Sequence, residues 1–130
     1  NLLYWRYGEY AGIGPGAHGR LVTAGGRIGT VTERSPEAWL ARVEREGHAV
    51  VETETLTAAD QADEFLVMGL RLREGIDPDR YAALKGRPLN GNRIGMLIGD
   101  GVLERLPGGR IAATAKGAPV LNALVAELAA

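Results

Sequence analysis

The sequence predicts an α+β chain, and three observations support this class. Two stretches with alternating apolar residues each turn at a pair of glycines, as β-hairpins do. Several other stretches place apolar residues at spacings of three and four, which is typical of amphipathic helices. The composition supports a packed core, because 45% of the 130 residues are hydrophobic and 24% are charged. We expect two lobes, residues 1–56 and 57–130, that pack on each other.

The first lobe is predicted to open with a strand and a hairpin. Residues 2–7 form a short aromatic and apolar run that stops at Gly8, which favours a buried strand over a helix. A glycine-rich loop follows this run. Residues 20–32 then predict a β-hairpin, because two stretches rich in β-branched residues flank a turn at Gly25 and Gly26.

A helix and a connector complete the first lobe. Ser35 as N-cap, a proline at the first helical position and Gly47 as a stop predict a helix over residues 36–46. Residues 52–56 form a connector or a short strand. The helix is expected to bury one face, formed by Trp39, Leu40 and Val43.

The second lobe is predicted to be mainly helical. Thr57, with Asp60 three residues later, marks the start of a helix whose apolar stripe runs to residue 73. Three helices, a hairpin and a last helix follow one another, which is the order of a winged-helix-like module. The expected elements are helices over 58–73, from Pro78 to near Gly86 and from Asn92 to Gly101, a hairpin over 102–114 that turns at 107–109, and a helix over 118–128.

Charge and composition exclude several classes of function. Fifteen basic and sixteen acidic side chains give a net charge of -1, which argues against sequence-independent binding of nucleic acid. The sequence has no cysteine, and its two histidines do not follow a metal-ligand spacing, so no metal site is expected. No apolar run is long enough for a membrane span and no leader is recognisable, so the cytoplasm is the expected location. Because the chain opens with Asn1, we interpret it as a piece of a longer protein.

The glycine-rich loop is the first candidate site. Its glycines allow positive φ angles and a close approach of the main chain to a ligand, but a purely structural tight turn explains them equally well. A dinucleotide fingerprint is contradicted by Pro15 and by the hairpin that follows. His18 either has a structural hydrogen bond or points at a ligand, for example as an axial ligand of iron. The loop reads Gly12-Ile13-Gly14-Pro15-Gly16-Ala17-His18-Gly19.

Other candidates have ordinary structural interpretations. His48 follows a predicted helix end, where a partly charged imidazole interacts well with the helix dipole. Tyr4 and Trp5 are large enough to stack on a flat cofactor, but such residues are first of all core residues. A solvated helix end is predicted for Arg71, Arg73 and Glu74, and a hairpin that contacts DNA is an alternative use of Arg93, Arg105 and Arg110.

Several segments in combination resemble one protein family over nearly the whole chain. The combination is similar to the C-terminal part of radical SAM proteins of the oxygen-independent coproporphyrinogen III oxidase-like family, specifically its haem chaperone branch. The endings Gly101-Val102-Leu103-Glu104 and Thr114-x-x-Gly117 also resemble that family. The main segments are Asn1-Leu2-Leu3-Tyr4-Trp5, the loop from Gly12 to Gly19, Ser35-Pro36-Glu37-Ala38-Trp39-Leu40 and Glu64-Phe65-Leu66-Val67-Met68-Gly69-Leu70-Arg71-Leu72.

The resemblance implies a longer protein with an N-terminal partial (β/α) barrel. In the family this barrel binds S-adenosylmethionine and holds a 4Fe-4S cluster on three cysteines. Residues 1–56 would then supply the last strands and the glycine loop of the barrel, and residues 57–130 a winged-helix-like C-terminal domain. Because the cluster-binding cysteines are absent here, this piece has no catalytic residues of its own and should be inactive alone.

The resemblance also implies site residues. Gly14, Gly16, Ala17 and His18 would lie near the S-adenosylmethionine or the haem, and Asn1, Tyr4 and Trp5 would lie near the haem or porphyrin. The chaperone branch carries a His-Asn-x-x-Tyr-Trp motif associated with haem binding, and this chain starts at the Asn of that motif. His18 favours the chaperone branch, because the oxidases tend to have an aliphatic residue at this position.

Three functions remain open from the sequence. The first is a chaperone that binds haem and delivers it to a target haem protein, including membrane-associated respiratory enzymes, with a homodimer left open. The second is the oxidase itself, which decarboxylates coproporphyrinogen III by a radical mechanism. The third is a winged-helix module that binds nucleic acid or another protein, although the charge balance argues against nucleic acid.

Overall fold

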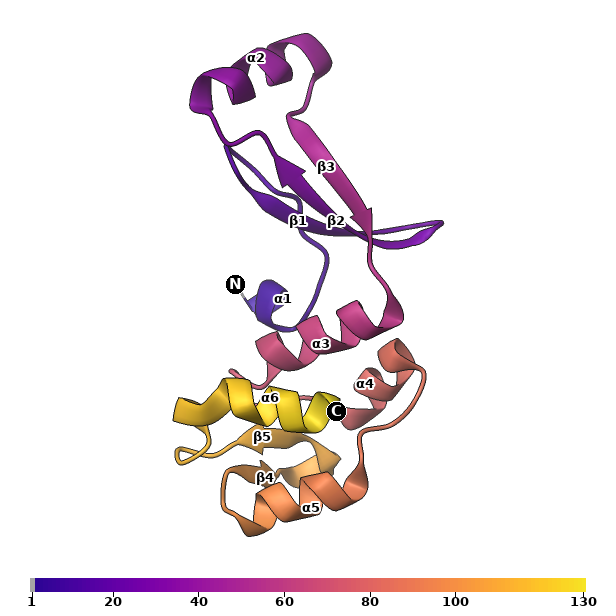
Figure 1. Cartoon of the computed structure of the whole chain (residues 1–130), viewed down its shortest axis with the longest axis vertical. Helices are drawn as coiled ribbons and strands as arrows, with labels where there is room; N and C mark the ends of the chain where they lie inside the picture. Colours follow the sequence, from indigo (N-terminus) through magenta and orange to yellow (C-terminus); the bar gives the residue numbers. More distant parts are fainter. Residues whose placement is uncertain (1) are drawn as a thin grey trace. The chain divides into compact units, whose positions relative to one another are not determined.

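The computed structural model describes residues 2–130, with the side chain of Tyr4 left out (Figure 1). The chain is α+β and divides into two compact units. Residues 8–56 form the N-terminal unit, and residues 57–130 form the C-terminal unit together with the chain up to Tyr7. No helix among the described residues has both the length and the apolar character needed to cross a bilayer.

The N-terminal unit is built on an antiparallel sheet with the strand order β1-β2-β3. The predicted hairpin is confirmed: Thr23 pairs with Gly26, so a two-residue turn joins the first two strands. The connector predicted at residues 52–56 is a full third strand that pairs with β2. A register shift between Val31 and Thr32 marks the end of the regular pairing. The elements are β1 (His18–Thr23), β2 (Gly26–Thr32), α2 (Pro36–Glu46) and β3 (Val50–Thr55).

Helix α2 has the predicted bounds but not the predicted burial. Ser35 is its N-cap, and Gly47 ends it with a φ of 82° and an N–H bond to the Val43 carbonyl. The buried face predicted for Trp39, Leu40 and Val43 is wrong for Leu40, which is 51% exposed, while Trp39 and Val43 are only partly buried. The periodic pattern correctly predicts a helix, but no side chain of the helix is fully buried.

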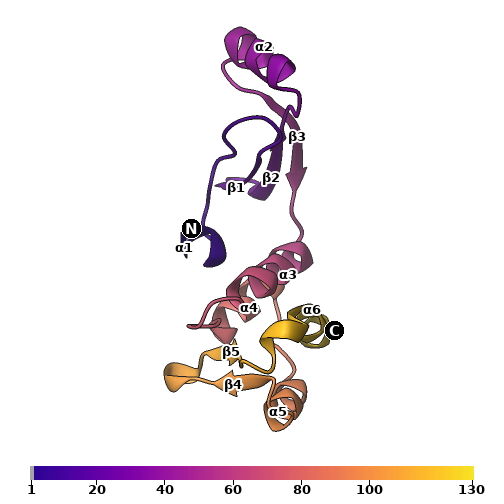
Figure 2. The ribbon, with the colours of Figure 1, turned by 90° about the vertical axis from the view of Figure 1, so that its left-hand side faces the viewer.

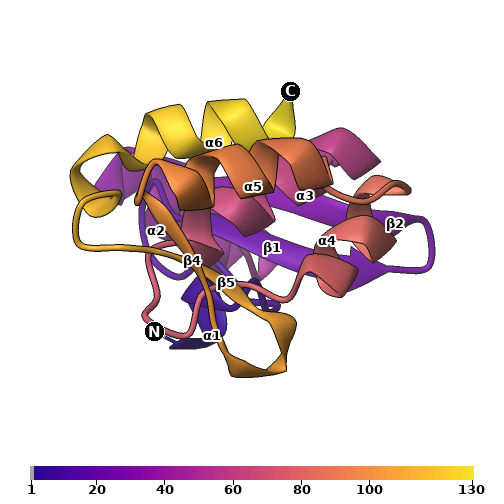
Figure 3. The ribbon, with the colours of Figure 1, turned by 90° about the horizontal axis from the view of Figure 1, so that it is seen from below.

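The C-terminal unit follows the predicted order of helices and hairpin. Figures 1 and 2 show the β4–β5 hairpin and α6 below α3, with α5 beyond β4. Helices α5 and α6 contact each other and run side by side in Figure 3. The elements are α1 (Leu2–Trp5), α3 (Ala58–Gly69), α4 (Pro78–Lys85), α5 (Gly91–Gly99), β4 (Leu103–Arg105), β5 (Ile111–Ala113) and α6 (Leu121–Ala129), with 3-10 turns at Pro107–Gly109 and Ala118–Val120.

The strand predicted at residues 2–7 is wrong. This segment forms the single helical turn α1, closed by a bond from the Arg6 N–H to the Leu2 carbonyl (2.8 Å). Tyr7 then turns the chain with a φ of 61° and buries its ring edge-on against Phe65 of α3. A short apolar run has too little periodicity to distinguish a strand from a helix, so contacts within the unit decide its form.

One apolar core holds the C-terminal unit together. The capping box of Thr57 and Asp60 starts α3 as predicted, and Phe65, Leu66 and Gly69 face the core. The helix ends at Gly69, four residues before the predicted end. The core joins α3 to the hairpin and to the last helix through Ile76, Tyr81, Leu103, Ile111, Leu124 and Leu128.

Candidate functional site

Glycines of the glycine-rich loop are needed for two different reasons. Gly14 and Gly16 have φ angles of 90° and 65°, which non-glycine residues rarely adopt. Gly12 lies against the main chain at the other end of the loop, where a Cβ would be 3.1 Å from the carbonyl carbons of Ala17 and His18. The loop therefore folds back on itself, and its glycines have a structural use.

Thr32, at the end of β2, holds this loop in place through hydrogen bonds. Its hydroxyl donates to the Gly14 carbonyl (2.7 Å) and accepts from the Ala17 N–H (2.7 Å), and its N–H donates to the Ala17 carbonyl (2.9 Å). The Gly16 N–H donates to the Glu33 carbonyl (2.8 Å). Because Thr32 is only 4% exposed, these bonds are protected from water. The N–H groups of Gly16 and Ala17 thus have partners within the chain, which supports the structural interpretation of the loop.

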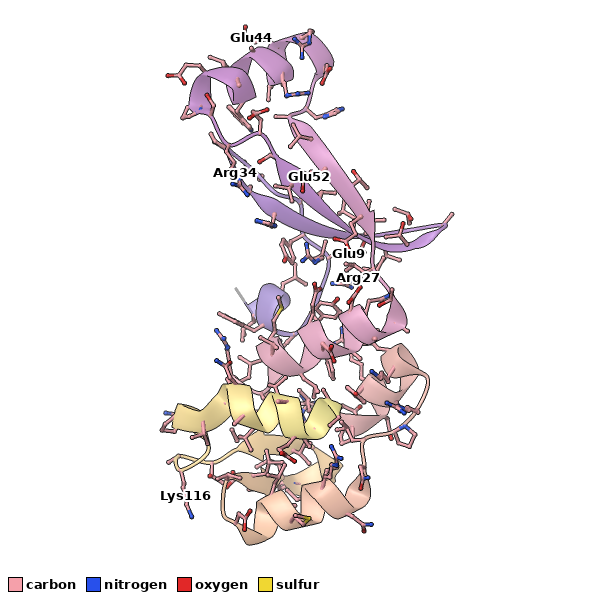
Figure 4. All side chains as sticks on the ribbon, viewed as in Figure 1. Glu9, Arg27, Arg34, Glu44, Glu52 and Lys116 are labelled. Atoms are coloured by element: carbon pink, nitrogen blue, oxygen red, sulfur yellow. The ribbon has the colours of Figure 1, made fainter. Side chains whose placement is uncertain are left out.

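The sequence contained no signal for this role of Thr32. It is one of two threonines in β2, and the residues that its hydroxyl bonds lie 15 and 18 positions away in the sequence. Arg34, labelled in Figure 4, lies beside the same loop, with its Cγ 3.6 Å from the position of a Cβ at Gly16. The loop therefore has one cationic side chain next to it.

His18 is the first residue of β1, and its side chain is exposed. Among the described residues its imidazole has no hydrogen-bond partner, so both ring nitrogens are accessible. It pairs with Val31, which pairs in turn with Glu52 of β3, so these three side chains share one face of the sheet. Glu52 is labelled in Figure 4. Of the two uses expected for His18, the structure leaves it available to a ligand.

His48 differs from His18, because its imidazole is engaged. Its Nδ1 accepts a hydrogen bond from the Val50 N–H (3.2 Å), just after the end of α2. His48 follows the Gly47 C-cap of α2, and its side chain is exposed. The chain thus offers two exposed histidines in the same unit, one with a local partner and one without.

The aromatic candidates lie in the other unit. Trp5 ends α1 and is partly buried, and the guanidinium carbon of Arg71 is 5.5 Å from the centre of its ring. The prediction for Asn1 lies outside the described residues, and nothing is described of the side chain of Tyr4. Trp5 therefore belongs to the C-terminal unit, whereas the glycine loop and His18 belong to the N-terminal unit.

Two of the three arginines considered for DNA contacts stabilise the C-terminal unit. Arg110 donates to the carbonyls of Glu74 and Gly75 (2.8 and 2.9 Å), and Arg93 donates to the Glu127 carbonyl near the end of α6 (3.0 Å). Carbonyls at a helix end are favourable partners for a cation. These contacts give Arg93 and Arg110 a structural role that does not involve nucleic acid.

Comparison with known proteins shows the family. The sequence profile of the HemN C-terminal domain matches residues 56–120, which is half of the chain. The chain belongs to the HemN C-terminal domain family. The resemblance to the C-terminal part of HemN-like radical SAM proteins is thereby confirmed.

The matches to individual relatives are longer than the match to this domain. The chain is 32% identical over 91 residues to the "Heme chaperone HemW" of Bacillus subtilis and 34% identical over 87 residues to that of Escherichia coli. It is 40% identical over 80 residues to "Radical S-adenosyl methionine domain-containing protein 1, mitochondrial" of Danio rerio. These matches cover 70%, 66% and 58% of the chain, but only 23%, 22% and 18% of the respective relatives. The chain thus spans about a fifth of their length.

A solved structure of the family shares the fold. It is the coproporphyrinogen III oxidase HemN from Escherichia coli, described as a radical SAM enzyme. The TM-score is 0.61, and the match covers 93% of this chain and 28% of that one. The two sequences are only 16% identical, so this likeness supports the α+β fold alone.

The donor groups of this HemN family chain do not fit the iron–sulfur cluster of radical SAM proteins. Such clusters are held by cysteine thiolates, and the 130 residues contain no cysteine. Haem requires less, because a single imidazole is a sufficient axial ligand and the side chain of His18 is exposed without a partner among the described residues. The chain can therefore supply a haem ligand but not the cluster.

Proposed function

We propose that this chain is part of a haem chaperone, a protein that binds haem and delivers it to target haem proteins. The observation that carries the proposal is the similarity to proteins named haem chaperones, at 32% and 34% identity over two thirds of the chain or slightly more. The exposed, unpartnered imidazole of His18 supports it, because an axial ligand must be free to approach the iron.

The proposal assigns roles to the residues that the sequence singles out. His18 is an axial ligand of the haem iron, and the bonds of Thr32 fix the preceding loop, with Gly14, Gly16 and Ala17, beside it. Trp5, with Asn1 and Tyr4, lies near the porphyrin. The glycine loop and the sheet then belong to the end of a partial barrel, and the C-terminal unit is its winged-helix-like neighbour.

The whole protein would contain what this chain lacks. We place the 4Fe-4S cluster and the S-adenosylmethionine site on an upstream barrel, as the radical SAM relatives suggest. The cytoplasm is the proposed location. Target haem proteins, including respiratory enzymes at the membrane, are the proposed partners, and a homodimer is a further proposal.

A haem titration with matched histidine variants tests the proposed function. The 130-residue chain is titrated with haem, and the Soret band is followed for the unchanged chain, for His18→Ala and for His48→Ala. His48 is the matched control, because it is exposed in the same unit but already accepts a bond from Val50. We expect a saturable Soret shift from coordination of the iron by imidazole, which is lost in His18→Ala and kept in His48→Ala.

Three results would count against the proposal. An equal shift in all three proteins would remove His18 as a ligand. Anaerobic conversion of coproporphyrinogen III by the corresponding full-length protein would favour the oxidase, which is the second candidate from the sequence resemblance. Salt-sensitive DNA binding that depends on Arg105 would instead support the winged-helix interaction module.

A further inference from the structure

The C-terminal unit contains an apolar cavity that the site described above does not use. Its volume is about 510 Å³, which falls within the range of roughly 300–1,000 Å³ that small-molecule sites occupy. It lies where the end of α3 meets the start of α6, and both ends are on the left of the unit in Figure 1. The apolar lining includes Leu70, Leu72, Ala118 and Leu121.

Two arginines line the same cavity. Arg71 and Arg73 follow the end of α3, and both are exposed. Among the described residues neither guanidinium has an ion pair or a hydrogen bond with an acidic side chain. The guanidinium carbon of Arg71 lies 5.5 Å from the centre of the Trp5 ring, a cation–π contact. An apolar cavity with two uncompensated cations is complementary to an apolar ligand that carries carboxylates.

The wall formed by the β5–α6 connection is held firmly. The Thr114 hydroxyl donates to the Gly101 carbonyl (2.6 Å) and accepts from the Gly117 N–H (3.1 Å). Gly117 packs so tightly that a Cβ would collide with the Val102 carbonyl. Lys116 next to it donates to the Asp100 carbonyl (2.9 Å), so its ammonium is engaged in the same turn (Figure 4). The cavity therefore exists before a ligand arrives, which lowers the cost of binding.

We infer that this cavity binds the carboxylate-bearing edge of a tetrapyrrole, with Arg71 and Arg73 as the groups that hold its carboxylates. The inference rests on the proposed function for the choice of tetrapyrrole over other apolar carboxylates. Each guanidinium forms two parallel bonds to a carboxylate, while the leucines and Ala118 contact the macrocycle. No metal takes part at this site, so the iron and its axial ligand are not needed for it.

Metal-free protoporphyrin IX and its dimethyl ester are the probes for this site. They share the macrocycle, but the ester has no carboxylates, so their difference in affinity measures the arginine contacts. Both are titrated into the 130-residue chain while the Soret band is followed. We expect the unchanged chain to bind the diacid more tightly than the ester. Dodecanoate as a competitor tests whether the site accepts any apolar carboxylate.

Matched variants localise the site. The double variant Arg71→Ala with Arg73→Ala should weaken binding of the diacid by about tenfold or more, because each lost charge-assisted bond costs affinity. The lysine pair, Arg71→Lys with Arg73→Lys, should recover part of the loss. The control pair, Arg87→Ala with Arg105→Ala, removes the same charge from exposed residues of the same unit that do not line the cavity, and it should change nothing. Ala118→Phe fills the cavity and should weaken both probes.

Equal affinity for diacid and ester, or equal effects of the two alanine pairs, would overturn the inference. The inference would also be overturned if dodecanoate bound through the two arginines and the tetrapyrrole did not bind. The His18→Ala variant separates this inference from the proposed function. It should leave binding of the metal-free probe unchanged. Failure of the proposed function would therefore show in the haem titration of the histidine variants, and failure of this inference in the porphyrin titration of the arginine variants.

Discussion

The two compact units are stabilised by different interactions. In the C-terminal unit, Leu66, Ile111 and Leu124 belong to one apolar core that joins helices and hairpin. Among the described residues, the buried hydrophobic side chains of the N-terminal unit are Ala49 and Leu56, while Arg27, Thr30 and Thr32 are its buried polar residues.

Hydrogen bonds contribute a larger share of the stability of the N-terminal unit. Its strands pair along their length, and Thr32 and Arg27 bond main-chain carbonyls of the segment before β1, Arg27 through a bond to Gly8 (2.9 Å). Apolar burial scales with the area removed from water, whereas one hydrogen bond contributes little net stability unless its loss leaves a buried group unpaired. The two units should therefore respond to different kinds of substitution.

The largest difference in unfolding free energy is expected when a leucine is replaced by alanine in each of the two units. Leu66→Ala removes a fully buried side chain from the C-terminal core and should lower the free energy of unfolding by about 3 kcal/mol. Leu40→Ala on α2 removes a half-exposed side chain and should lower it by less than about 0.5 kcal/mol. Urea unfolding followed by far-ultraviolet circular dichroism measures both.

The two tryptophans allow the unfolding of each unit to be followed separately. Trp5 lies in the C-terminal unit and Trp39 in the N-terminal unit, so Trp39→Phe and Trp5→Phe each leave one reporter. With Trp5 as reporter, Leu66→Ala should shift the transition to lower urea concentration. Similar effects of Leu66→Ala and Leu40→Ala would contradict the view that apolar burial is concentrated in one unit.

A smaller effect is expected where hydrogen bonds fasten the glycine loop. Thr32→Val keeps the shape of the side chain but leaves the Gly14 carbonyl and the Ala17 N–H without their partner, and it should cost about 2 kcal/mol. Thr23→Val is the control, because Thr23 is exposed and bonds only the Gly26 carbonyl within the turn. The Trp39 reporter measures both variants, and equal losses would show that the loop does not depend on Thr32.

The elements that the sequence predicted correctly are those whose signals lie within a few neighbouring residues. Ser35 and Thr57 cap their helices as the sequence predicts, because a cap involves only residues a few positions apart. Glycine pairs likewise mark both hairpins correctly. The apolar pattern of α2 predicted the helix but not its exposure, since burial depends on what the rest of the unit can place against it.

The site was less predictable than the fold, because its contacts link distant residues. The sequence singled out the glycine loop and His18, but the role of Thr32 depends on bonds to residues 15 and 18 positions away in the sequence. Arg71 and Arg73 were interpreted as a solvated helix end, and they are exposed, yet they also line a cavity completed by α6 some fifty residues later. Neither feature has a signature in a short sequence window.

The smallest effect is expected for an exposed ion pair within the C-terminal unit. The Arg6 Nε lies 2.6 Å from Glu74 Oε1, and the two side chains are 53% and 38% exposed. The hydrogen bond from Arg6 is the main cause that lowers the pKa of Glu74 below its ordinary value of 4.5. A lowered pKa means that the pair stabilises the fold above about pH 4.5, and that this contribution is lost as the pH falls through the folded-state pKa.

Arg6→Gln should therefore flatten the pH dependence of the unfolding free energy below pH 4.5, whereas Arg73→Gln, its matched control, should not. Because solvent screens an exposed pair, the difference should be small and should vanish in about 1 M salt. A pH profile that is the same for Arg6→Gln and the unchanged chain would show that the pair does not stabilise the contact between residues 2–7 and the rest of the unit.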